Sequence, residues 1–149
     1  MKRITGRASA HVDAPPDRVF DVITDLGRLP AWNRRMLDVV TVPHELRVGS
    51  EWVVRLQVFG RRFTSRSHVI ELDRAARRFV HRSKPEDDNP SFTVWTWRVE
   101  PAGGGSTVTV EWDMRPVTLV RRWVMAPVRD RHMRRGEAAA SLAALARVC

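Results

Sequence analysis

The sequence predicts an α+β fold in which a curved antiparallel sheet of about seven strands wraps around one long helix near the C-terminus. Three observations carry this prediction. Residues 52–114 alternate between apolar and polar side chains in successive segments separated by turns, as strands with one buried face do. Two short helical patterns follow a first strand, within residues 12–33. An alanine-rich, proline-free stretch after Arg129 predicts a helix of about twenty residues, ~30 Å long, enough to cross the sheet.

The first strand, residues 3–12, is predicted from a weak alternation of small and apolar residues. Pro15 and Pro16 then end strand pairing, because proline donates no backbone hydrogen bond, yet both suit the first turn of a helix. The apolar residues that follow recur at helical spacing, and Gly27 is placed to end this helix. Pro30 opens a second short helical turn.

Residues 36–42 predict the next strand, and two hairpins follow whose registers can be predicted from their turns. The glycine-rich turn at 101–105 is the clearest in the chain. Centring the last hairpin there pairs Trp95 with Trp112, Trp97 with Val110 and Val99 with Val108. Centring the earlier hairpin on a turn at 60–62 pairs Val58 with Phe63 and Leu56 with Ser65. In both hairpins the apolar set meets the apolar set, as one shared buried face requires.

The other face of the predicted sheet is polar. Its residues alternate with the apolar set, and Phe59 falls in the same alternating set. An antiparallel sheet with one buried and one solvated face follows from this pattern. The polar set consists of Arg55, Gln57, Arg66, Arg82, Arg98, Glu100, Glu111 and Asp113.

Length and composition limit the classes of protein to consider. The 149 residues suit a single domain spanning 1–149, and no apolar run approaches the ~20 residues of a membrane span, so we expect a cytoplasmic protein. The single cysteine, Cys149, excludes a cysteine-clustered zinc site, and the five histidines show no metal-ligand spacing, so we expect no metal and no cofactor. The net charge of +9 indicates either an anionic partner or an arginine-rich composition.

The buried face of the sheet predicts a cavity rather than a filled core. Tryptophans and methionines supply an apolar, adaptable lining, and a polar minority stands where a closed core would hold aliphatic residues. Apolar pockets with a few convergent polar groups are typical small-molecule sites. The alternative is that these side chains fill the core. The expected lining is Trp32, Met36, Trp52, Leu56, Phe63, Ser65, Ser67, Phe79, His81, Ser83, Thr93, Trp95, Trp97, Val110, Trp112, Met114 and Met133.

Two residues are candidates for catalysis. His81 faces the interior in the predicted register and has an intrinsic pKa suited to a general base, although an interior histidine can equally satisfy a structural hydrogen bond. Arg66 faces outward, and a register slip of one residue would turn it inward. No glycine-rich phosphate loop and no nucleophile motif accompanies them.

The motifs Ala14-Pro15-Pro16, Val19-Phe20, Thr24-Asp25-Leu26 and Pro30-Ala31-Trp32-Asn33, in this order, resemble the SRPBCC (START/Bet v 1-like) superfamily, especially its bacterial polyketide cyclase/dehydrase-like branch. The resemblance implies a helix-grip fold with an apolar lumen, and members that bind lipids, polyketides, quinones or hormones. It also implies, for the cyclases, a pocket tyrosine and an interior arginine in the strand at 63–72. This chain has no tyrosine, and Met36 stands where one is expected.

Three functions follow as hypotheses. The first is a carrier or sensor that binds a hydrophobic small molecule, lipid- or polyketide-like, without turnover. The second is a polyketide cyclase, aromatase or dehydratase acting in the cavity. The third is binding to an anionic surface or nucleic acid through the basic side of the C-terminal helix, with Arg131, Arg134 and Arg135 in contact. We expect no sequence-specific nucleic-acid partner, and a monomer or homodimer.

Overall fold

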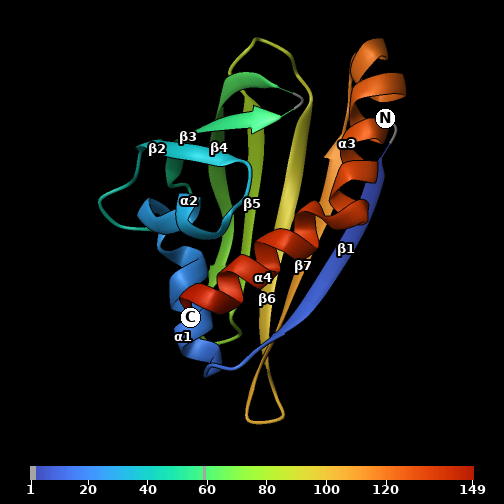
Figure 1. Ribbon diagram of the computed structural model, residues 1–149. Coiled ribbons are helices and arrows are strands. Elements are labelled where there is room, and N and C mark those ends of the chain that lie inside the picture. Colours follow the sequence, from blue (N-terminus) through green and yellow to red (C-terminus); the bar gives the residue numbers. More distant parts are fainter. Residues whose placement is uncertain (1–2, 59) are drawn as a thin grey trace.

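A computed structural model describes residues 3–58 and 60–149; Phe59 and the first two residues lie outside the described residues. Seven antiparallel strands form one sheet in the order β1-β7-β6-β5-β4-β3-β2 (Figure 1). The predicted α+β helix-grip arrangement is confirmed. The strands are β1 (Ile4–Val12), β2 (Met36–Thr41), β3 (Glu51–Val58), β4 (Arg61–Asp73), β5 (Arg78–Pro85), β6 (Phe92–Ala102) and β7 (Gly105–Arg115).

Two short helices and a connecting turn separate β1 from β2, as predicted. They are α1 (Pro16–Thr24), the 3₁₀ turn η1 (Leu26–Arg28) and α2 (Leu29–Trp32). Both helices carry proline in the first turn, where its missing N–H costs nothing. Val19, Phe20 and Ile23 are buried on the inner side of α1.

The C-terminal helix differs from the prediction in two ways. It begins at residue 119, well before the stretch after Arg129 from which we predicted it, and it bends at Gly136, whose φ of +150° breaks the helical path. Two π-helical turns interrupt it, one of them directly before the turn that holds Pro127, and such turns are a common cause of bending. Its parts are η2 (Arg121–Met125), α3 (Ala126–His132), η3 (Met133–Glu137) and α4 (Ala138–Val148).

The predicted register of the last hairpin is confirmed, including the pairing of Trp95 with Trp112. The predicted register of the β3–β4 hairpin is wrong by two residues. β4 begins at Arg61, which pairs with Val58, so Leu56 lies opposite Phe63 and Val54 opposite Ser65. The connection is shorter than the turn we expected at 60–62. Because side chains alternate with a period of two, this error left every residue on its predicted face.

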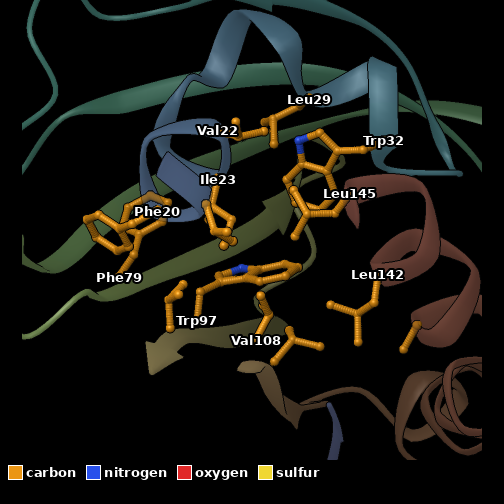
Figure 2. Close-up of a cluster of buried hydrophobic side chains, with 14 of the residues drawn as sticks. Phe20, Val22, Ile23, Leu29, Trp32, Phe79, Trp97, Val108, Leu142 and Leu145 are labelled. Atoms are coloured by element: carbon orange, nitrogen blue, oxygen red, sulfur yellow. The ribbon is translucent and has the colours of Figure 1, made fainter. Parts of the chain in front are cut away.

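The helix α4 crosses one face of the sheet, and its C-terminal end lies beside α1 (Figure 1). Close packing fills this end of the molecule. Trp97 of β6 lies beneath Ile23 and Leu145, and Val108 lies below it (Figure 2). The Trp32 ring meets the Trp97 ring edge-on, with 5.3 Å between centroids. An aromatic pair in this geometry adds stability beyond its buried area.

The outer face of the sheet is polar, as predicted, and several of its charged side chains form ion pairs. Arg66 bridges Glu51 at 2.9 Å and Glu86 at 2.6 Å, and Arg55 lies 2.9 Å from Asp38. Because these pairs are exposed, each contributes little to stability. No helix in the described part of the chain is long and apolar enough to span a bilayer.

Candidate ligand-binding cavity

A cavity of about 420 Å³ lies between the inner face of the sheet and the C-terminal helix. Strands β3 to β7 form its wall, while residues of η2, α3 and η3 cover it from the other side. The lining residues that are also exposed mark its opening: Arg61 and Arg62 at the start of β4, Asp87 in the β5–β6 loop, and Met125 in η2. The cavity therefore opens between the β3–β4 hairpin and the first turns of the C-terminal helix.

The structure brings together all but one of the residues predicted to line the cavity. The strand positions share one face because the alternation was assigned correctly, and Trp32 and Met36 reach the cavity from α2 and β2. The predicted residues on its wall are Trp32, Met36, Trp52, Leu56, Phe63, Ser65, Ser67, Phe79, His81, Ser83, Thr93, Trp95, Trp97, Val110, Met114 and Met133.

Trp112 is the exception, because it lies outside the cavity wall. Its indole lies over Gly6 of β1, where an added Cβ would come within 2.4 Å of the ring. Its Nε1 donates a hydrogen bond of 2.8 Å to Asp130 of α3. Trp112 is thus a buried side chain that links the sheet to the helix. The sequence could not show this, because alternation gives the face of a residue and not the direction in which its ring turns.

Arginines near the opening are the main lining residues that the sequence analysis missed. Alternation marks only positions within strands, whereas these residues come from strand ends, loops and the irregular first turns of the helix. The sequence pattern alone predicts for the arginines of residues 121–135 either a solvated helix side or contact with an anionic surface, and neither places them on a cavity wall. The arginines on the wall are Arg35, Arg61, Arg62, Arg115, Arg121 and Arg129.

Two of the four predicted polar lining groups on β4 and β5 already have protein partners. Trp95 Nε1 donates to Ser83 Oγ at 2.8 Å, and Ser65 Oγ donates to the Lys84 carbonyl at 3.3 Å. The hydroxyl of Ser67 has no hydrogen-bond partner among the described residues. Ser67 and His81 are therefore the polar groups of these strands best placed to bind a ligand.

His81 lies in an aromatic environment on the cavity wall. Its ring is 4.9 Å from that of Trp52 and 5.2 Å from that of Phe79, centroid to centroid. Burial lowers its pKa from 6.5 to about 3, because the charged imidazolium loses its hydration, so the ring is neutral at pH 7.

The Nδ1 of His81 is buried without a partner in the described part of the chain. An unpaired buried acceptor is tolerated better than an unpaired N–H. This favours the tautomer with the proton on Nε2, leaving an N–H donor as the group that His81 can offer to the cavity.

The structure places Arg66, the second candidate catalyst, on the outer face of the sheet. It is absent from the cavity wall and is held there by Glu51 and Glu86. His81, with a pKa near 3, is a weak base at neutral pH. Neither residue therefore has both the position and the basicity of a general base acting in this cavity.

Side-chain contacts tie the β5–β6 loop to the start of the C-terminal helix across the opening. Asp87 pairs with Arg121, and the Val117 N–H donates to Ser91 Oγ at 2.8 Å. A second set of contacts joins η3 to α3 and to the segment before β2: Glu137 pairs with Arg129 and, at 3.4 Å, with Arg35. These polar contacts hold the helix over the cavity, in addition to its buried apolar residues Ala126 and Met133.

The family model described as "Polyketide cyclase / dehydrase and lipid transport" matches residues 3–149. Among solved structures, the Zhui aromatase/cyclase from Streptomyces sp. R1128 is 20% identical with a TM-score of 0.72, covering 97% of this chain and 92% of that chain. A protein from Thermus thermophilus is 18% identical, with a TM-score of 0.75 and coverage of 97% and 95%. The ginseng major latex-like protein 151 from Panax ginseng is 12% identical, with a TM-score of 0.67 and coverage of 93% and 97%. No curated protein matches the sequence. At these identities the solved structures show a shared fold.

Proposed function

The chain belongs to the polyketide cyclase/dehydrase and lipid transport family, and we propose that it binds one hydrophobic small molecule, lipid- or polyketide-like, as a carrier or sensor. The observation that carries the proposal is the cavity of about 420 Å³ on the core side of the sheet. Its volume lies within the range of sites that enclose a small ligand.

The free energy of packing supports this proposal. A closed, dry apolar cavity costs ~24 cal/mol per Å³, so the upper bound of the cost for a cavity of about 420 Å³ is on the order of 10 kcal/mol. Water entering through the opening offsets part of this cost. A free-energy cost of this size is comparable to the whole free energy of unfolding of a small domain. A ligand that fills the cavity accounts for its being left open.

The polar groups on the wall indicate the chemistry of the ligand. His81 offers an N–H donor, and the Nε1 groups of Trp32 and Trp52 are buried without partners in the described part of the chain. Buried donors left unpaired cost free energy. We infer that the ligand carries carbonyl, ether or hydroxyl oxygens along an apolar body, which small shifts of the rings bring within hydrogen-bond distance.

Binding without turnover is preferred over cyclase activity. Arg66 lies outside the cavity, His81 is a weak base, and the chain has no tyrosine. We expect His81→Ala to change ligand affinity by no more than about tenfold, or ~1.4 kcal/mol. If the protein were a cyclase that used His81, the same substitution would abolish turnover of a polyketide substrate while the fold stayed intact.

The test is native mass spectrometry of the protein purified from its own host, followed by denaturing extraction. We expect a co-purifying apolar mass. Ser67→Phe, which places an aromatic ring inside the cavity where the ligand is proposed to lie, should lose that mass, whereas Thr64→Phe on the outer face of the same strand should keep it. The proposal fails if no mass is bound and no compound of a lipid and polyketide panel raises the melting temperature.

We also propose that the protein acts in the cytoplasm. This expectation comes from the sequence analysis, and fractionation of host cells would test it. Recovery outside the cytoplasmic and peripheral-membrane fractions would contradict it.

A further inference from the structure

The first turns of the C-terminal helix expose an unusual amount of apolar surface. We define the apolar strip as Leu119, Val120, Trp123, Val124 and Val128, whose exposed fractions are 70, 64, 66, 54 and 40%. Val120, Val124 and Val128 recur every four residues and so lie along one side of the helix. The outer side of a surface helix is normally polar. A contiguous exposed apolar patch of this kind indicates an interaction site.

The apolar strip lies beside the opening of the cavity. The helical turns that expose the apolar strip on one side also place four residues on the cavity wall on the other: Arg121, Met125, Ala126 and Arg129. Met125, next to Val124 of the strip, is 40% exposed and also lines the cavity. Whatever covers the strip therefore also lies at the entrance.

The charge around the apolar strip selects the kind of partner. Residues 117–135 contain six arginines and one aspartate, a net charge of +5 out of +9 for the whole chain. Arg131 and Arg135 are exposed and have no ion-pair partner among the described residues. Two copies meeting through this strip would bring like charges together, which opposes self-association. Aliphatic side chains bordered by arginines match the boundary between acyl chains and anionic headgroups.

We propose that residues 119–135 dock on an anionic lipid bilayer, with the apolar strip in the acyl-chain boundary and the arginines at the headgroups. Docking itself does not depend on the proposed function. Its consequence does: the opening of the cavity faces the bilayer, so that an apolar ligand enters and leaves without crossing water.

Vesicle sedimentation tests the docking. The purified protein should bind vesicles of phosphatidylglycerol and phosphatidylcholine in equal parts, and bind pure phosphatidylcholine at least tenfold more weakly. The triple variant Leu119→Ser, Val120→Ser, Val124→Ser should lose at least tenfold in affinity for the anionic vesicles. Arg131→Gln with Arg135→Gln should weaken binding and flatten its dependence on salt.

Matched controls come from exposed apolar residues elsewhere. Val48 is 63% exposed and Ile70 is 48% exposed, and neither lies in the apolar strip. Val48→Ser and Ile70→Ser should bind anionic vesicles like the unmodified protein. Equal binding by the triple variant, or equal binding to both kinds of vesicle, would overturn the proposal.

Two further outcomes would also overturn it. Sedimentation velocity would show a dimer that the triple variant abolishes if a second copy covers the strip. Fluorescence anisotropy with a labelled oligonucleotide would show tight binding, in the absence of vesicle binding, if the partner is nucleic acid. The triple variant should still retain the co-purified ligand, so failure of docking can be told apart from failure of the ligand-binding function.

Discussion

His81 combines a cavity-facing position with a pKa of about 3, and this makes stability depend on pH. The unfolded chain binds a proton at this histidine below about pH 6.5, whereas the folded chain does so only near pH 3. Because protons therefore bind the unfolded chain first, the free energy of unfolding is highest above pH 6.5 and falls as the pH drops toward 3.

We therefore expect His81→Leu to reduce the slope of the free energy of unfolding against pH, between pH 6.5 and 4, by up to about 1.4 kcal/mol per pH unit. Urea unfolding at a series of pH values measures this slope. His44→Leu, in the exposed loop before β3, serves as a control and should keep the slope of the unmodified protein. An unchanged slope in His81→Leu would show that the folded and unfolded chains bind this proton over the same pH range, and thus that burial does not keep the imidazole neutral.

Gly6 leaves no room for an added methyl group. A Cβ at this position would lie 2.4 Å from the Trp112 indole, which is buried and hydrogen-bonded to Asp130. We expect Gly6→Ala to destabilise the protein by about 1–3 kcal/mol through overpacking. Thermal unfolding measures the change. Ala8→Ser, two residues along the same strand, is the comparison; a Gly6→Ala variant as stable as that one would mean that the indole can move away freely.

Among the helices and strands, the C-terminal helix is the one whose bend at Gly136 shapes the cover of the cavity. Gly136 has φ +150°, which L-residues rarely adopt, and nothing lies within 4 Å of a Cβ built there. The cost of Gly136→Ala is therefore conformational and not steric, about 1–3 kcal/mol. We expect a lower melting temperature, together with weaker ligand binding if the helix straightens away from the cavity. Ala139→Gly, at an exposed helical position, should cost only about 1 kcal/mol and leave binding unchanged.

The contact between the β5–β6 loop and η2 lies at the opening of the cavity. Asp87 and Arg121 both line the cavity and pair with each other across it. Since the pair is partly exposed, Asp87→Asn should change stability by less than about 1 kcal/mol. It should speed ligand exchange, which stopped-flow displacement measures. Asp88→Asn, in the same loop but outside the cavity wall, is the control. Equal exchange rates for both variants would show that the pair does not gate the entrance.

At the scale of the whole molecule, the fold divides into a packed end and a hollow end. Ile23, Trp97 and Leu145 pack together at the end formed by α1, α2 and α4, where Ile23 and Trp97 also close off the cavity, whereas β3–β7 and η2–η3 enclose the rest of it. A ligand that binds only the folded chain stabilises it by about 2.7 kcal/mol at a hundredfold excess over Kd. We expect extraction of the bound mass to lower the melting temperature, and readdition to restore it.

Alternating strands and one long helix were predictable because they rest on local periodicity. The period of two assigned Trp52, Ser67, His81 and Trp95 to one face, and the glycine turn at 101–105 set the register of the last hairpin correctly. The β3–β4 register was wrong by two residues, and the lining set survived because such a slip preserves the face. The family resemblance of the first 33 residues was likewise readable from motifs, and the match over residues 3–149 confirms it.

Local periodicity could not predict which of the buried residues line the cavity and which pack against other side chains. Trp112 and Trp95 face each other on one side of the sheet, yet only Trp95 lines the cavity, because Gly6 leaves room for the Trp112 ring and Asp130 holds its nitrogen. The bend at Gly136 and the outward turn of Val120 and Val124 depend on how the helix packs across the sheet. Alternation within a strand is a property of neighbouring residues, and so the sequence carries it. A cavity and its entrance are properties of surfaces that meet across the fold, and they exist only once the chain has packed.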